Sequence, residues 1–113
     1  MKFMMFVRVR PGTSLVPEER QRMHADLDAW VSDTDRRGIR QQGAELLGGE
    51  AARMVRVRDG SVEVASGSPE EHGESITGFD ILDCASLEEA IALASRHPVA
   101  KFGAIDLRPF AEA

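Results

Sequence analysis

The first ten residues alternate in a way that predicts a β-strand. In the segment Lys2–Val9 every second side chain is apolar, so one face of the strand points to a core. Met4 and Phe6 make the opposite face apolar as well. A strand that is apolar on both faces needs protein on both sides. We therefore expect helices on one side of this strand and a second subunit on the other.

A long helix is predicted from Pro17 to Arg37. Pro17 suits the first turn, where its missing N–H would have no partner, and Gly38 offers the left-handed residue that often follows a helix. Apolar residues recur along this helix at a spacing that forms one stripe, which we expect to pack on a sheet. The stripe consists of Met23, Leu27, Trp30, Val31 and Thr34.

Residues 54–64 carry the clearest local pattern in the chain, a β-hairpin. Two alternating runs flank Asp59-Gly60, the dipeptide that favours a two-residue type I′ turn. Such a turn fixes the register and leaves one face of the hairpin apolar. The expected cross-strand pairs are Val57 with Val62, Arg56 with Glu63, and Val55 with Val64.

The second half of the chain predicts another strand, helix and strand. Ser86 and Glu89 have the spacing of a capping box at a helix start, and Pro98 ends that helix. We expect its buried stripe to consist of Leu87, Ala90, Ile91 and Ala94. The remaining expected segments are a strand around Ala44–Leu47, a loop over Ser66–Thr77, a strand over Phe79–Cys84 and a strand over Phe102–Arg108.

The order of these elements predicts the fold class. Two strand–helix–strand halves with a hairpin between them favour an α+β fold, a ferredoxin-like sandwich that carries the hairpin as an insertion. The length of 113 residues suits a single domain over residues 1–113. A chain of this size often hides further apolar area in a subunit interface, which again favours a homodimer.

Charge and cysteine content exclude several classes of function. The net charge of −5 argues against a nucleic-acid-binding protein, and the cluster of Arg36, Arg37 and Arg40 fits a solvated helix end. No segment approaches membrane-spanning length, and charge interrupts the opening segment too early for a signal peptide, so we expect a cytoplasmic protein. Cys84, the single cysteine, lies in an apolar strand and is expected to be a small buried residue.

Several short segments, taken together in order and spacing, resemble a known family. They are the opening Met-Lys-Phe-Met, Pro17-Glu18-Glu19-Arg20, Gly38, the run from Val55 to Gly60, Gly78-Phe79, and Leu87-Glu88-Glu89-Ala90. This series resembles the YCII-related family, in the branch named for the motif Asp-Gly-Pro-Phe. The positions of that motif fall on Ser66, Gly67, Ser68 and Pro69, of which only the glycine matches.

The resemblance implies a dimeric α+β barrel, in which two sheets pack face to face and each subunit encloses a small cleft. It implies no defined reaction, although some relatives are associated with alternative sigma factors and the fold is similar to that of muconolactone isomerase. The family tends to carry Gly-Gly-Glu after the first helix. Glu45 falls one place later than that pattern, and one place reverses the face in a strand, so the role of that carboxylate in relatives is not carried over to Glu45.

His24 and Asp28 are one candidate catalytic pair. They lie one turn apart on the first predicted helix, where the carboxylate can orient the imidazole and raise its basicity as a general base. The resemblance supports a histidine in this helix. The alternative is a surface histidine on the polar flank of the helix.

Glu71 and His72, in the loop after the hairpin, are the second candidate pair. Together with Glu70 and Glu74 they bring carboxylates and an imidazole close together on a loop beside a sheet. Their spacing matches no known metal motif, and an exposed acidic loop explains them equally well, so we expect no metal site and no cofactor. We assign no chemistry to His97, which fits a helix end.

These observations leave three classes of function open, and whether the chain is an enzyme stays undecided. We favour a small-ligand-binding or regulatory homodimer with a small molecule in its cleft, because the family's loop aspartate is replaced at Ser66. The first alternative is a small-molecule isomerase or lyase that uses a histidine–carboxylate base. The second alternative is a sigma-factor-associated accessory protein.

Overall fold

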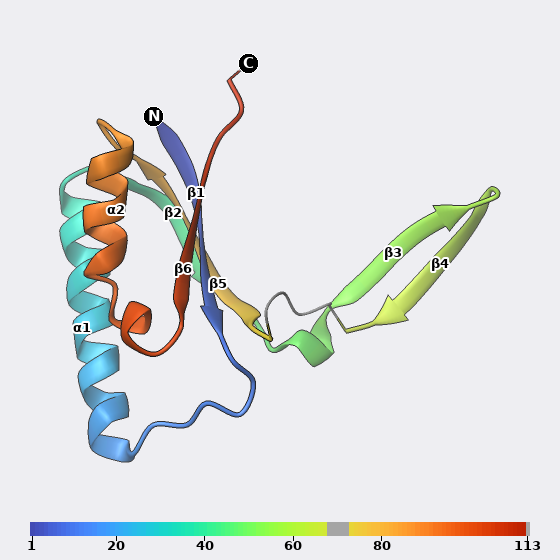
Figure 1. Cartoon of the computed structure of the whole chain (residues 1–113), viewed down its shortest axis with the longest axis horizontal. Helices are drawn as coiled ribbons and strands as arrows, with labels where there is room; N and C mark the ends of the chain where they lie inside the picture. The colour runs from blue at the N-terminus through green and yellow to red at the C-terminus, as the bar shows by residue number, and fades with distance from the viewer. Residues whose placement is uncertain (68–72, 113) are drawn as a thin grey trace.

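The structure, a computed structural model, describes residues 1–67 and 73–112. Figure 1 shows a layered body from which a long hairpin projects. The elements are β1 (Lys2–Val9), α1 (Pro17–Arg36), β2 (Arg40–Glu45), η1 (Gly49–Ala51), β3 (Arg53–Arg58), β4 (Ser61–Ser66), β5 (Ser75–Asp83), α2 (Leu87–Ser95), η2 (Pro98–Lys101) and β6 (Ala104–Pro109), where η marks a short 3₁₀ helix.

Four strands of the body form one antiparallel sheet in the order β2-β5-β1-β6. Both α-helices pack on the same face of this sheet (Figure 1). The strands β3 and β4 pair only with each other among the described strands and form a separate sheet. The ferredoxin-like α+β architecture with an inserted hairpin, predicted from the sequence, is therefore confirmed.

The core lies between the helices and the sheet. Phe3, Met5 and Leu82 are fully buried on the helix-facing side of β1 and β5. The indole Nε1 of Trp30 donates a hydrogen bond of 2.9 Å to the carbonyl of Leu93, which ties α1 to α2. The predicted apolar alternation of Lys2–Val9 and the stripe along α1 thus build the interior that the sequence indicated.

The hairpin forms as predicted. Val57 pairs with Val62, Arg56 with Glu63, and Val55 with Val64. Asp59 and Gly60 both have positive φ, 51° and 76°, as the two central residues of a type I′ turn require. The four valines stay exposed because the hairpin leaves the body instead of folding onto it (Figure 1).

Two strands differ most from the predicted boundaries, while β6 covers Ala104–Pro109 instead of Phe102–Arg108. The second strand covers Arg40–Glu45 and not Ala44–Leu47, and β5 begins at Ser75 inside the expected loop. The two differences have separate causes: β2 is an edge strand held by backbone pairing to β5, whereas the start of β5 is a strand because Ser75 and Ile76 pair with β1. An edge strand needs no apolar alternation, and Gln41 and Gln42 are exposed on it.

The start of α2 differs slightly from the predicted capping box, and its buried stripe is different. Ser86 Oγ accepts the backbone N–H of Glu89 at 3.1 Å, as expected, but the Glu89 carboxylate accepts the N–H of Ala85. Leu87 and Ile91 are exposed. The residues of α2 that are buried are Ala90, Leu93 and Ala94, so the helix turns mainly small residues to the interior.

The sheet face opposite the helices has no helix of the described chain over it (Figure 1), and it combines an apolar centre with the ion pairs of Arg8, Asp106 and Arg108 toward β6. We call it the open sheet face. The register places on it the half-buried Met4 and Phe6 of β1, and Ile81 and Phe79 of β5 opposite them. No described helix is long and apolar enough to cross a membrane.

Candidate functional site

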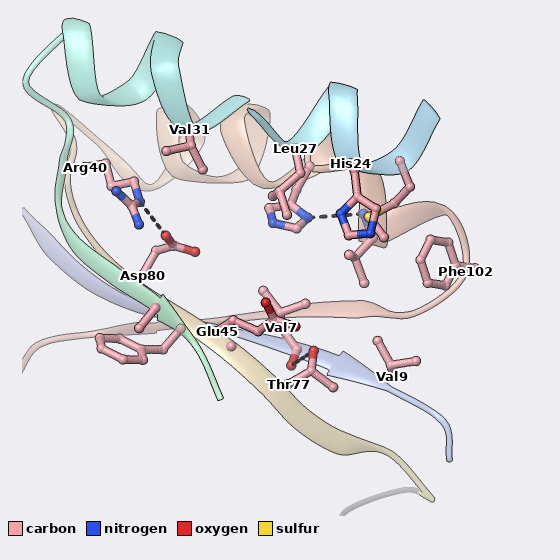
Figure 2. A pocket seen from close by; sticks show the side chains of 16 residues that line it. Val7, Val9, His24, Leu27, Val31, Arg40, Glu45, Thr77, Asp80 and Phe102 are labelled. Atoms are coloured by element: carbon pink, nitrogen blue, oxygen red, sulfur yellow. Dashed lines mark hydrogen bonds and ion pairs between the residues drawn. The ribbon is translucent and has the colours of Figure 1, made fainter. Parts of the chain in front are cut away.

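A cavity of about 260 Å³ lies between α1 and the helix-facing side of the sheet (Figure 2). From above, α1 contributes Leu27 and Val31, two residues of its apolar stripe that point toward the sheet. From below, Val7 and Val9 of β1 contribute the floor. The middle of the cavity is therefore apolar, and it is built by the same patterns that form the core.

An ion pair lies at one end of the cavity. Nε of Arg40 donates to Oδ1 of Asp80 at 2.7 Å, and its Nη1 donates to Oδ1 of Asp35 at 3.1 Å. Asp80 is 6% exposed and the side chain of Arg40 is 17% exposed. Figure 2 shows this pair on the opposite side of Val31 and Leu27 from His24. Arg40 thus belongs to a buried pair, and not to the solvated helix end predicted from the sequence.

Gly43 makes room for this ion pair. A Cβ at position 43 would collide with Oδ1 of Asp80 and with the guanidinium of Arg40. The glycine lets the side chain of Arg40 cross over β2 and reach Asp80 on the neighbouring strand.

Burial raises the pKa of the Asp80 carboxyl above its ordinary value, while the hydrogen bond and charge of Arg40 act in the opposite direction. The charged form of Asp80 is thus stabilised by Arg40. A negatively charged group placed beside Arg40 would compete with Asp80 for the same guanidinium. The end of the cavity at Arg40 is therefore suited to an oxygen-bearing ligand group that accepts a hydrogen bond from Arg40, while Asp80 and Asp35 disfavour a full negative charge there.

His97 is a second buried polar residue in the cavity wall. Its Nδ1 accepts the backbone N–H of Val99 at 3.1 Å and so caps η2. Burial lowers the pKa of His97 from 6.5 to about 4, so the imidazole is neutral and carries its proton on Nε2. The ring also packs edge-on against Trp30, with 5.0 Å between the ring centroids.

The pair of His24 and Asp28 is only half assembled. His24 lines the cavity from α1, beside Leu27 (Figure 2). Asp28 is exposed and is not part of the cavity lining, and no hydrogen bond joins the two side chains in the described part of the chain. The structure therefore brings His24 to the site without the carboxylate expected to orient it.

The other predicted pair, Glu71 and His72, lies outside the described residues, together with Glu70. Within residues 1–67 and 73–112, no group of three histidine, cysteine, aspartate or glutamate side chains is placed to hold a metal ion. Cys84 is buried as expected, and burial raises the pKa of its thiol.

Glu45 lies on the cavity side of β2, although it falls one place later than the family pattern. It pairs with Gly78 of β5, as Gly43 pairs with Asp80, so all four residues share the helix-facing side. The register of β2 shifts only between Arg40 and Gln42, so the pairing of Gly43 and Glu45 is regular and the two residues share a face. Glu45 therefore lines the cavity.

Three residues of the site were missed in the sequence: Arg40, Asp80 and His97. One of them left a signal there, because Asp80 interrupts the apolar run Phe79–Cys84 at a position that faces the core. A charged residue in a buried strand needs a partner. Nothing in the sequence indicated that Arg40 would be that partner, since the pairing depends on how β2 lies against β5.

Comparison with known proteins agrees with this architecture. The family model described as YCII-related domain matches residues 1–112. A similar solved structure is 5-chloro-2-hydroxyhydroquinone dehydrochlorinase from Burkholderia phenoliruptrix AC1100, in complex with 2,5-dihydroxybenzoquinone. It superposes with a TM-score of 0.60 at 17% sequence identity, covering 100% of this chain and 96% of that chain. No protein of curated function matches the sequence significantly.

Proposed function

The chain belongs to the YCII-related family, and from that premise we propose that it is a homodimer that binds a small organic ligand in the cavity beneath α1. The observation that carries this proposal is the division of the cavity into an apolar middle and polar ends. Leu27 and Val31 face Val7 across the middle, Arg40 with Asp80 lies at one end, and His24 lies toward the other.

The size and lining of the cavity favour a small ligand with one ring or a short chain. A volume of about 260 Å³ is near the lower end of ligand pockets, which run from roughly 300 to 1,000 Å³. An apolar ring would rest between Leu27 and Val7, and an oxygen substituent would accept hydrogen bonds from Arg40. A hydroxylated aromatic compound or a quinone has this distribution of apolar and oxygen groups.

Binding is best tested by titration calorimetry with 2,5-dihydroxybenzoquinone, the molecule bound in the similar structure, and with simple hydroxybenzoates. We expect a dissociation constant between roughly 10⁻⁶ and 10⁻³ M, as befits a ligand of so few atoms. Leu27→Phe fills the cavity and should abolish binding, and Arg40→Gln should weaken it at least about tenfold.

Arg36→Gln is the matched control, because Arg36 is an exposed arginine near the same helix end that pairs with Asp33 and does not line the cavity. Its affinity should equal that of the unaltered protein. The proposal fails if none of these compounds binds, or if binding survives in Leu27→Phe.

The open sheet face supports the homodimeric part of the proposal. An antiparallel sheet that faces water usually carries polar residues on that side. Here Met4, Phe6, Phe79 and Ile81 occupy the centre of the face, and the charged residues beside them, Arg8, Asp106 and Arg108, are paired with one another toward β6. A second copy of the chain, packed sheet to sheet, would bury these residues on both subunits at once.

A specific observation favours one second candidate, an isomerase or lyase. Two histidines, His24 and His97, and two carboxylates, Asp80 and Glu45, line the same cavity. An accessible imidazole beside the apolar middle of the cavity is suited to remove a proton from a bound ring. Release of chloride from 5-chloro-2-hydroxyhydroquinone would support this candidate if His24→Asn abolishes it while Asp28→Asn leaves it unchanged.

A further inference from the structure

The hairpin formed by β3 and β4, residues Arg53–Ser66, is the most unusual feature of the molecule, and we call it the arm. It leaves the body beyond the ends of β2 and β5 and extends into solvent (Figure 1). The radius of gyration is 16.0 Å, whereas a compact domain of roughly 100 residues has about 13 Å. A single chain thus fails to reach the compactness usual for its length.

One face of the arm is a continuous apolar surface. Val55, Val57, Val62 and Val64 face the same side and are 58–68% exposed. The opposite face carries the pair of Arg56 and Glu63, which is suited to water. The arm therefore has the two-faced pattern of a sheet that packs on something, yet no described part of its own chain covers the valines.

An isolated two-stranded hairpin is at best marginally stable in water. The arm pairs only within itself among the described strands, so its stability needs a packing partner outside the described chain. A long exposed strand pair is also a hazard for aggregation unless it is covered. Both arguments require a surface that buries the valine face.

The direction of the arm indicates which partner supplies that surface. Figure 1 shows the helices on one side of the sheet and the arm reaching out on the other side, where the open sheet face lies. A partner that covers the open sheet face would thus lie beside the arm. A second copy of the chain meets both needs at once, because in a twofold dimer each subunit offers the same sheet face and the same arm.

Two copies of the chain carry −5 each, but the contact between an arm and a second copy is between opposite charges. Three arginines and two carboxylates give the arm a net charge of +1. The whole chain has a net charge of −5, so the rest of the chain carries −6. An arm of one subunit would therefore be attracted to the acidic body of the other.

We propose that the arm is a dimer clasp, whose valine face packs against the second copy of the chain that covers the open sheet face. This inference rests on the homodimer proposed above and adds the surface that holds it. Each subunit would contribute one arm and receive one, so the dimer would be held at the sheets and again at both arms.

The test is sedimentation equilibrium of the full chain and of two double variants. Val57→Thr with Val62→Thr keeps β-branched side chains, and thus strand propensity, while it makes the apolar face polar. We expect the dimer dissociation constant to rise about tenfold or more. Arg56→Thr with Glu63→Thr places the same residue on the opposite face of the same strands and should change the constant less than about threefold.

Hydrogen exchange provides a second readout that does not depend on a variant. The amides of β3 and β4 should be protected at concentrations above the dimer dissociation constant and should exchange rapidly below it. Near-ultraviolet circular dichroism of Trp30 confirms that the body of each variant is folded.

The possible outcomes distinguish the clasp from the homodimer on which it rests. A chain that is monomeric at every concentration overturns both the homodimer and the clasp. A dimer whose dissociation constant is unchanged in the valine variant overturns the clasp alone and leaves the sheet-to-sheet dimer in place. Weakening in the valine variant but not in its control supports the clasp.

Discussion

The ion pair of Arg40 and Asp80 depends on a residue with no side chain. Gly43 leaves the space in which the guanidinium crosses β2, and a methyl group there would collide with both partners. The collision involves side-chain ends, so Arg40 can move outward into solvent. Asp80, which is buried, would then lose its cation. Leaving one partner of a buried pair alone is the costly case for such pairs.

Gly43→Ala is therefore expected to lower the free energy of unfolding by about 2–4 kcal/mol. Urea denaturation monitored by Trp30 fluorescence measures this change. Gly48→Ala is the control, because there a Cβ would meet only the carboxylate of Glu50, which is exposed and able to move. If both substitutions have the same small effect, the space at Gly43 is not what maintains the pair.

His97 makes the stability of the protein depend on pH. Its folded-state pKa of about 4 is below the ordinary 6.5, because burial disfavours the imidazolium. Between these two values the unfolded chain binds a proton that the folded chain does not. The contribution of His97 to the free energy of unfolding is therefore fully present above about pH 6.5 and is lost as the pH falls toward 4.

His97→Asn should remove this pH dependence. The asparagine side-chain oxygen can take the place of Nδ1 and accept the N–H of Val99, so the cap of η2 is retained. As the pH falls from about 6.5 to about 4, we expect the free energy of unfolding of the unaltered protein to decrease relative to that of the variant. The decrease should be at most about 1.4 kcal/mol per pH unit. If the free energy of unfolding changes with pH by the same amount in both proteins, His97 is not the source of the pH dependence.

Comparing the unaltered protein with His97→Asn also removes the contribution of Asp80 to the pH dependence of stability, which has the opposite sign. The pKa of Asp80 is raised, so the folded chain holds that proton to higher pH than the unfolded chain does. Asp80 is present in both proteins of the comparison, so its contribution cancels to first order in the difference.

At the scale of elements, local sequence patterns were reliable where they met no competing contact. The bounds of β1 and the register of the hairpin follow directly from alternation and from the turn dipeptide Asp59-Gly60. For α2, the cap residue Ser86 was identified correctly. The prediction that Leu87 and Ile91 are buried was wrong, because α2 turns Ala90, Leu93 and Ala94 to the interior instead.

The edge strand β2 illustrates where local patterns fail. Its sequence Arg40–Glu45 contains no apolar alternation, and it is a strand because β5 supplies hydrogen-bond partners. Its pairing with β5 then determines that Gly43 and Glu45 face the cavity. A property that depends on the neighbouring strand cannot be read from the residues of β2 alone.

At the scale of the whole molecule, the open sheet face gives the clearest test of the homodimer. Ile81→Glu places a charge opposite Met4 on that face. We expect the unaltered chain to sediment at twice its 12.4 kDa and this variant to sediment as a monomer. The melting temperature should rise with concentration for the unaltered chain only, because association stabilises the folded state by mass action.

Ile91→Glu is the matched control for that experiment. It makes the same substitution on α2, where Ile91 is already 53% exposed and far from the sheet-to-sheet surface. This variant should remain dimeric. A dimer that persists in Ile81→Glu would mean that the open sheet face is not the interface.

The sequence by itself determined the fold class, the helix and strand patterns, the hairpin register and the need to cover both faces of β1. These follow from period, turn chemistry and capping, which act between residues a few positions apart. Only the tertiary structure decided the site. Arg40 meets Asp80 across 40 positions, and His97 reaches the cavity through the fold of η2, because such contacts depend on strand pairing and packing between distant segments.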